Sequence, residues 1–256
     1  MQVLIVAHQN DAVAFRLRQE LECRGAMVHY YNGPSAARLF TIHVGSHSTS
    51  VAPSLPMFVR PSAWCQQPAD HADEQFLRAE AYATFWAAAA LSPSLVINRP
   101  WPDGSVGRLT WGKLTAVLDS HPAGSDSEIY VSGREIFKAD DSTWGEDWEF
   151  HVSRIAQFKS GTPLRARKVS PGTLYEIVTV VSERGFPATA DPRTVEFQLV
   201  ERSVALAEKA GVYFASITWA VDENGAAPVR LNPAPQQFEL RYNWHQVADA
   251  LCEGLM

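Results

Sequence analysis

Polar residues at the end of a segment near the carboxyl terminus are the first candidates for chemistry. The segment PVRLNPAPQ, residues 228–236, has the pattern of a strand that runs into Asn-Pro-x-Pro, which is typical of the metal-binding end of an active site. Magnesium prefers hard oxygen ligands, chiefly carboxylates and carbonyls. Asn232 offers an amide oxygen, but Arg230 occupies the position where such a site needs a carboxylate. The sequence leaves open whether this strand end retains its chemistry or only its shape.

Two carboxylates lie on the other side of the expected hairpin. Asp222 and Glu223, in the stretch DENG, are near enough to Asn232 to be considered as ligands. Asp, Asn and Gly in succession favour an exposed turn, so we interpret this stretch as a solvated hairpin tip. This turn by itself therefore predicts no metal.

Other reactive side chains lack the neighbours that their chemistry requires. His43 and His47 have i, i+4 spacing, but the surrounding Gly and Ser disfavour a helix and no third ligand is evident. Ser46 and Ser132 lack the context of a nucleophile elbow. Cys65 has no base near it in sequence and is interpreted as a packed thiol. We expect no catalytic residue among them.

Composition excludes several classes of function. The chain has 256 residues with 46% hydrophobic and 20% charged residues, which is typical of a folded domain or two. A net charge of -6 disfavours nucleic acid, whose binding depends on clustered Lys and Arg. The three cysteines are scattered and predict neither disulfides nor a zinc site. The opening MQVLIVAHQN is neither a signal peptide nor a membrane span, so we expect a cytoplasmic protein without membrane contact.

The first hundred residues predict a small α/β layer structure. The expected elements are a buried strand over 3–7, a helix from residue 12 to Gly25, strands over 27–31, 57–61 and 94–100, a loop over 34–56, and a helix over 73–91. The 73–91 helix is rich in Ala and aromatic residues without a polar face of ordinary width. We therefore expect it to be mostly buried, against the sheet or a second subunit. A dinucleotide-binding Rossmann domain is disfavoured, because AHQNDAVA after the first strand lacks a glycine-rich turn.

The remainder predicts mixed helices and antiparallel strands. The expected elements are a helix over 111–118, a strand over 127–133, turns over 139–163 with a short helical segment near 148–158, a hairpin over 173–189, a helix over 194–211, two strands over 212–232, and a helix over 242–255. The alternation of apolar and polar residues and the DENG turn are the main signals.

In their order these pieces resemble the ATP-grasp ligases, especially the branch that modifies ribosomally made peptides. The resemblance is carried by VINRP after the Ala-rich helix, by YEIVTVVSERGFPA, and by AEKAGVYFASITWAVDENGAAPVRLNPAPQQF followed by HQVADALCEGL. It implies an α/β protein with an N-terminal Rossmann-like pre-ATP-grasp unit, residues 1–105, packed on a C-terminal mixed α+β ATP-grasp-like unit, residues 106–256.

The resemblance also implies that the family's Mg-ATP site is degenerate here. The family's metal-binding Asp aligns with Thr218, and its Glu-x-Asn pair aligns with Arg230 and Asn232. Ile177 occupies the place of a phosphate-binding Arg, and residues 140–163 are too few for the central nucleotide-clamping subdomain. At these positions the amide of Asn232 alone cannot offset the desolvation of magnesium, and Arg230 adds a like charge beside the cation. We therefore expect a truncated relative with no metal, no cofactor and no ligase reaction.

The expected function is that of a non-catalytic peptide-binding accessory protein in a ribosomal peptide pathway. The expected partners are a precursor peptide, pathway enzymes and a second copy of the chain. Candidate peptide contacts are Trp144 and Trp148 in an acidic segment, Tyr175 in the 173–189 strand pair, and Arg230. Two alternatives stay open: a divergent ATP-dependent carboxylate–amine ligase, and a structural homodimeric subunit.

Overall fold

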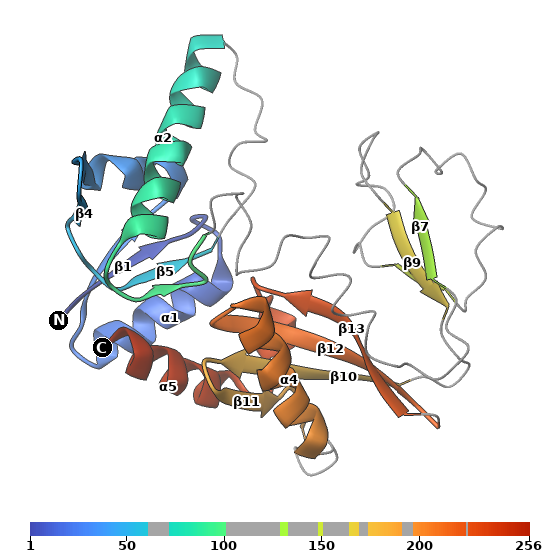
Figure 1. The fold of residues 1–256 in the computed structure, drawn as a ribbon. Helices are drawn as coiled ribbons and strands as arrows, with labels where there is room; N and C mark the ends of the chain where they lie inside the picture. Colours follow the sequence, from blue (N-terminus) through green and yellow to red (C-terminus); the bar gives the residue numbers. More distant parts are fainter. Residues whose placement is uncertain are drawn as a thin grey trace.

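The computed structural model describes residues 1–60, 72–100, 129–132, 148–150, 164–168, 174–190, 197–223 and 225–256. Two four-stranded sheets form the main layers of the described chain, and helices cover them (Figure 1). Among the described helices, none is long and apolar enough to span a membrane. The predicted helix over 111–118 and most of the segment 139–163 lie outside the described residues.

The N-terminal sheet is parallel, with the strand order β2-β1-β5-β6. Its elements are β1 Gln2–Val6, α1 Ala12–Cys23, β2 Met27–Tyr31, β5 Met57–Val59 and β6 Val96–Ile97. The apolar run of β1 is buried on both faces, as expected for a central parallel strand. The Asp11 side chain caps α1 by accepting a hydrogen bond from the Ala14 amide at 2.9 Å, and Gly25 follows the helix with φ 83°. The predicted β-α-β opening is confirmed.

The segment predicted as a loop over 34–56 is instead ordered into short elements. It contains the 3-10 helix η1 Gly33–Leu39 and a hairpin of β3 Thr41–Val44 with β4 Thr49–Ala52. β-branched residues are frequent in both strands, which pair over a short turn at Gly45, where the Gly45 amide bonds to the Ser48 carbonyl at 2.8 Å. The abundance of Ser, Pro and Gly concealed this signal.

The helix α2 Ala72–Leu91 has the predicted bounds but is much less buried than predicted. Its carboxyl-terminal half buries Phe85, Ala88 and Ala89 against η1 and the sheet. Its amino-terminal half projects beyond the sheet (Figure 1), where Phe76 and Leu77 are 63% and 66% exposed. The prediction that α2 is buried against the chain's own sheet was therefore wrong for this half. Its burial against a second subunit stays a prediction.

The C-terminal sheet is antiparallel, with the order β11-β10-β12-β13. Its strands are β10 Leu174–Val181, β11 Arg184–Pro187, β12 Phe214–Asp222 and β13 Gly225–Asn232. One face packs on α4 Phe197–Ala210, and the other on η6 Gln237–Leu240 and α5 Trp244–Leu255. Both predicted strand pairs and both predicted helices are confirmed.

A third sheet contains three short antiparallel strands in the order β7-β9-β8. They are β7 Ile129–Ser132, β8 Trp148–Phe150 and β9 Leu164–Lys168. The strand β7 was predicted. The helical interpretation of residues 148–150 was wrong: Trp148 and Phe150 flank Glu149 in a strand whose partner is β9.

The two main units share one core, as the resemblance implied. Apolar residues of β1 and α1 pack in one cluster with Phe214 and with the apolar face of α5. The rings of Phe58 and Phe214 lie 5.9 Å apart between centroids and join β5 to β12. The ion pair between Arg24 and Asp249 adds a polar contact between α1 and α5 at the surface. The N-terminal α/β unit is thus packed on the C-terminal α+β unit, while the boundary at 105/106 stays a prediction.

Candidate functional site

The strand register brings the predicted site positions together. Thr218 of β12 lies directly opposite Arg230 of β13 on one side and opposite Ile177 of β10 on the other. Directly opposed residues of an antiparallel sheet project from the same face. Ile177, Thr218 and Arg230 therefore form one cross-strand row, and the register between β12 and β13 shifts immediately after Thr218.

The next row is polar throughout. Thr179, Ser216 and Asn232 oppose one another across the same three strands. Alternate residues such as Val178 and Ile217 pack toward α4, so both rows project from the sheet face that η6 and α5 partly cover. The predicted remnant of a metal site, which consists of Thr218, Arg230 and Asn232, is thus one compact surface.

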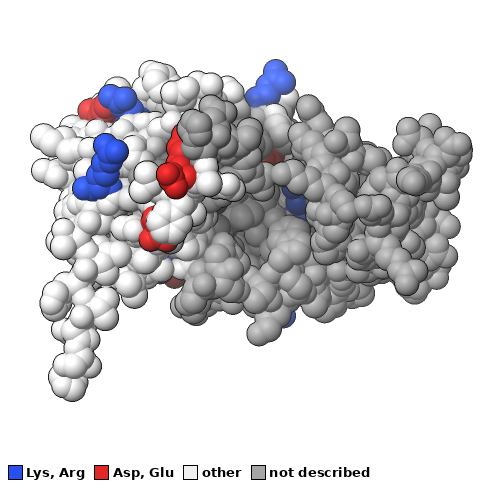
Figure 2. Space-filling view, turned by 90° about the horizontal axis from the view of Figure 1, so that it is seen from above, with Lys and Arg blue, Asp and Glu red and all other residues white. Residues whose placement is uncertain are grey.

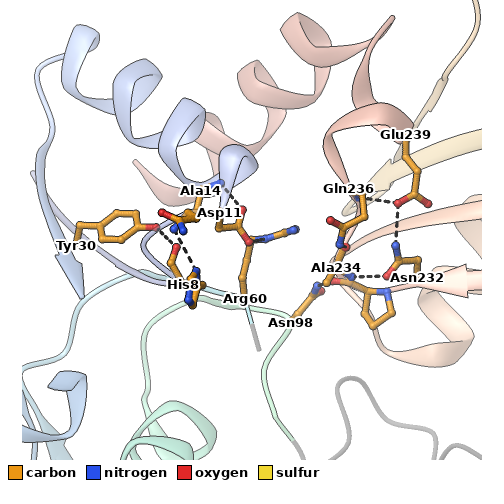
Figure 3. Close-up of polar contacts among 12 residues, drawn as sticks. His8, Asp11, Ala14, Tyr30, Arg60, Asn98, Asn232, Ala234, Gln236 and Glu239 are labelled. Carbon is orange, nitrogen blue, oxygen red and sulfur yellow. Dashed lines mark hydrogen bonds and ion pairs between the residues drawn. The ribbon is translucent and has the colours of Figure 1, made fainter. Parts of the chain in front are cut away.

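A buried carboxylate that the sequence analysis missed lies beside Asn232. Glu239 of η6 is 1% exposed and accepts hydrogen bonds from the Asn232 amide at 2.8 Å, from the Gln236 backbone amide at 2.6 Å and from the Ser216 hydroxyl. The Asn232 Oδ1 atom accepts from the Ala234 amide at 3.1 Å (Figure 3). The spacing of Gln236 and Glu239 forms a capping box, which was the available sequence signal.

These contacts stabilise the end of β13. Each carboxylate oxygen of Glu239 already accepts a hydrogen bond, and Asn232 uses both ends of its amide within the chain. In the described residues no three His, Cys, Asp or Glu side chains are grouped to hold a metal. The row of Ile177, Thr218 and Arg230 offers an alkyl group, a hydroxyl and a cation but no anionic oxygen, so these three side chains do not fit the ligand set that Mg²⁺ prefers.

The candidate peptide contacts are only partly assembled. Tyr175 lies on β10 two residues before Ile177 and therefore shares its face, with 46% of its surface exposed beside the 67% exposed Leu174. Trp148 begins β8 and pairs with Lys168 of β9, in a different sheet. Trp144 lies outside the described residues. The structure thus places Tyr175 on the sheet face that carries Arg230. It does not test the contacts predicted for the two tryptophans.

A second polar cluster, also missed from sequence, lies at the carboxyl ends of the parallel strands. Arg60, 5% exposed, donates from Nε to Asp11 Oδ2 at 2.6 Å. The Tyr30 hydroxyl donates to the His8 carbonyl at 2.8 Å. Burial, reinforced by the negative charge of Asp11, raises the pKa of Tyr30. This hydroxyl is therefore held as a neutral donor.

Asn98 joins the two units between these clusters. It is 2% exposed and has φ 57°, a left-handed conformation that is uncommon outside glycine. Its Oδ1 atom accepts from the Phe214 amide at 2.9 Å, and its Nδ2 atom donates to the Phe214 carbonyl at 2.7 Å and to the Pro233 carbonyl. The residue after β6 is thereby fixed to both β12 and the turn that follows β13.

Solved structures of ATP-grasp ligases have a similar fold. PsnB, solved with a minimal precursor, Mg and ADP, superposes with a TM-score of 0.68 at 15% identity, over 99% of this chain and 97% of PsnB. The macrocyclase MdnC from Microcystis aeruginosa MRC, bound with the precursor peptide MdnA, gives 0.67 at 14% identity over 100% and 99% of the two chains. A RimK domain ATP-grasp protein from Sphaerobacter thermophilus DSM 20745 gives 0.57 at 14% identity over 100% and 99%.

The fold is therefore that of the ATP-grasp ligases, including ligases that modify ribosomally made peptides. No family model matches the sequence, and no curated protein is significantly similar to it. At these identities the likeness establishes the fold alone. The comparison covers nearly the full length of PsnB and MdnC, so it gives no support to the expected loss of a central subdomain.

Proposed function

We propose that this chain is a peptide-binding accessory protein of a ribosomal peptide pathway that uses the ATP-grasp fold without Mg-ATP chemistry. In this proposal it acts in the cytoplasm, needs no cofactor, and presents a precursor peptide to pathway enzymes. The observation that carries the proposal is the row Ile177, Thr218 and Arg230, which sets a cation among the positions that the resemblance assigns to phosphate and metal ligands.

Charge is the physical reason why this row opposes nucleotide binding. Magnesium must be drawn from water by ligands that carry negative charge, and it then bridges the phosphates. A guanidinium at Arg230 repels the cation instead. Glu239 does not compensate, because it lies buried in hydrogen bonds that hold η6 to Asn232 and Ser216. The site therefore suits a ligand with its own negative charge and no metal.

Peptide binding is supported by the solved relatives and by the exposed part of β10. PsnB and MdnC were solved with precursor peptides. In this chain Leu174 and Tyr175 expose apolar surface on the strand that leads to Ile177. An extended peptide that anchors a side chain on Tyr175 and a carboxylate on Arg230 uses both features. Trp144 and Trp148 are proposed as further contacts.

The peptide half of the proposal is tested with candidate precursor peptides, taken from short reading frames next to the gene for this chain. Fluorescence anisotropy of a labelled peptide should show saturable binding to the wild type without ATP. Tyr175→Ala and Arg230→Ala should each weaken binding about tenfold, as expected for a lost anchor or ion-pair contact. Arg18→Ala, on an exposed i, i+4 pair of α1, is the matched control and should bind normally. Unchanged affinity in both site variants would contradict the proposal.

A second candidate function, a divergent ligase, is favoured by one observation: a carboxylate does lie beside Asn232. If Glu239 turned from the Asn232 amide toward a metal, part of a ligand set would form. This candidate predicts magnesium-dependent ATP binding that Glu239→Gln abolishes. The accessory-protein proposal predicts that the wild type itself shows no magnesium-dependent ATP binding.

A homodimer is proposed on the evidence of α2. Its projecting half exposes Phe76 and Leu77 next to each other, and neighbouring exposed apolar side chains favour a contact with a protein partner. Figure 2 shows scattered charges of both signs on the described part of one face, without a continuous basic patch. This fits a protein partner better than nucleic acid. A purely structural homodimer is the third candidate, distinguished by the absence of peptide binding.

A further inference from the structure

We propose that the N-terminal unit binds a carboxylate between the carboxyl ends of β1 and β5, through the guanidinium of Arg60. This site is separate from the Arg230 row and is a further binding site beyond the proposed function. It rests on a buried arginine with an unused donor, on the topology of the sheet, and on the start of α1.

The position follows from the strand order. From β1 the chain runs through α1 to β2 on one side of the sheet, and later reaches β5 on the other side of β1. In open α/β sheets, ligands bind outside the carboxyl ends of the strands at the point where connections diverge in this way. Arg60 immediately follows β5, and its backbone amide bonds to the Val6 carbonyl at 2.9 Å, so the residue is fixed at this point.

The Arg60 side chain has a donor that the described chain does not use. The residue is 5% exposed and its Nε atom is held by Asp11 at 2.6 Å. Its Nη1 atom is buried, and no described residue accepts a hydrogen bond from it. Buried polar groups almost always have a partner, because an unpaired donor loses its hydration without compensation. An oxygen acceptor from a ligand satisfies this requirement.

The surroundings orient the guanidinium toward a ligand. Asp11 accepts from Arg60 with Oδ2 and caps α1 with Oδ1, which couples the side chain to the helix start. Figure 3 shows the Nε side of the guanidinium against Asp11 and its far end extending toward the segment that carries Ala234 and Gln236. The positive end of the α1 dipole lies on the same side of the sheet and adds a further attraction for an anion.

The same surroundings favour a carboxylate over a phosphate. The planar guanidinium matches a carboxylate by directed hydrogen bonds. Asp11 already neutralises the charge of Arg60, so a dianion meets more repulsion from Asp11 than a monoanion does. The carboxylate belongs either to a free small acid or to an acidic residue of a peptide, and the two sources share this chemistry.

The test is an NMR titration of the full chain labelled with 15N-arginine. The Nε resonance of Arg60 is assigned by its loss in Arg60→Lys. Sodium acetate represents a free acid, and N-acetyl-Gly-Glu-Gly-amide represents a peptide-borne carboxylate. We expect saturable shifts of the Arg60 resonance with both, at least tenfold tighter than with inorganic phosphate. Tighter binding of the tripeptide than of acetate assigns the site to peptides, and equal binding assigns it to any carboxylate.

Variants test whether Arg60 binds the ligand or only supports the fold. As a second readout, the midpoint temperature of thermal unfolding is measured for the wild type and each variant at increasing acetate concentration. Arg60→Gln and Arg60→Lys should lose the acetate-dependent rise, and the exposed-pair variant Arg18→Gln should keep it. If Arg60→Gln does not fold, Arg60→Lys decides. No saturable shift at Arg60, tighter phosphate binding, or the same acetate response in Arg60→Lys overturns the proposal. These probes do not include the precursor peptide. A negative result here would therefore not contradict the proposed binding of the precursor peptide at Tyr175 and Arg230.

Discussion

At the scale of single residues, the polar contacts around the strand ends divide into those that hold the fold and those that face a ligand. Asn232 and Glu239 belong to the first kind, because their polar atoms are engaged within the chain. Arg230 and Arg60 are the residues that we propose for the second kind. Arg230 lies half-exposed on the β13 edge of the sheet, and Arg60 keeps a buried unpaired donor. Substitutions of Asn232 or Glu239 should therefore lower stability, whereas substitutions of Arg230 or Arg60 should lower ligand binding.

Glu239→Gln should lower the free energy of unfolding by about 1–3 kcal/mol, the usual cost of leaving a buried donor unpaired. Glutamine replaces one carboxylate oxygen by an NH2 group, which then faces a donor from Ser216, Asn232 or the Gln236 backbone. Urea unfolding followed by circular dichroism measures the difference. Glu223→Gln at the exposed hairpin tip is the control and should be neutral. Equal stability of both variants would show that Glu239 is free to serve a ligand.

Asn98→Ala should cost more stability than Asn98→Gly, although both remove the same amide. Both variants lose the hydrogen bonds to Phe214 and Pro233, at about 1–3 kcal/mol for the buried groups left unpaired. Alanine also pays for φ 57°, by about 1 kcal/mol relative to glycine. Chemical denaturation of the three proteins measures both effects. A more stable alanine variant would contradict the described backbone at this position.

At the scale of elements, α5 is the helix on which the two units depend. Its apolar face packs on α1 and on Phe214 in the shared core, and Cys252 is fully buried within it. Arg24 and Arg184 bridge to Asp249 and Glu253 at its surface. Such exposed ion pairs add little stability, so the burial of the apolar face carries the packing.

Stability should fall as pH rises from about 9 to 11, and Cys252 should account for part of the fall. Burial raises the pKa of this thiol from 9.0 to about 11. In the unfolded chain the thiol ionises above pH 9, while the folded chain keeps it protonated, so ionisation favours unfolding in this window. Urea midpoints from pH 8 to 11 measure the slope. Cys252→Ala should flatten it, and the exposed Cys23→Ala should leave it unchanged. An unaltered slope in Cys252→Ala would contradict this assignment.

The projecting half of α2 should hold two copies together. Phe76→Glu with Leu77→Glu puts charge on the apolar surface and should convert a dimer to a monomer, because burying unpaired charge at an interface is unfavourable. Light scattering after size exclusion measures the mass. Val44→Glu, at the 73% exposed β3–β4 hairpin, is the control and should leave the dimer intact. A wild-type monomer, or a dimer in the double variant, would contradict this interface.

At the scale of the whole molecule, the sequence predicted the elements that have strong local patterns. Apolar runs and the glycine at residue 25 identified the β-α-β opening, and alternation around DENG identified β12 and β13. Alignment to the ligase motifs also placed Ile177, Thr218 and Arg230 in one site, which the strand register confirms as neighbours.

The sequence failed where structure depends on distant partners. Asp11 and Arg60 are 49 residues apart and meet only because β1 and β5 run parallel side by side. Glu239 meets Ser216 through the register of β12 and β13. The exposure of Phe76 depends on how far α2 extends past the sheet, which periodicity does not encode. Residues near Trp148 form a strand because β9 supplies its hydrogen bonds.

The central claim, an ATP-grasp fold without Mg-ATP chemistry, is tested most directly by calorimetry of the full chain. Mg-ATP is titrated up to millimolar concentrations, with a magnesium-free titration as the control. The Thr218→Asp, Arg230→Glu double variant is titrated in parallel, because it restores carboxylates to the two positions. We predict no binding heat from the wild type. Saturable, magnesium-dependent heat from the wild type would contradict the account, because the chain would then bind Mg-ATP.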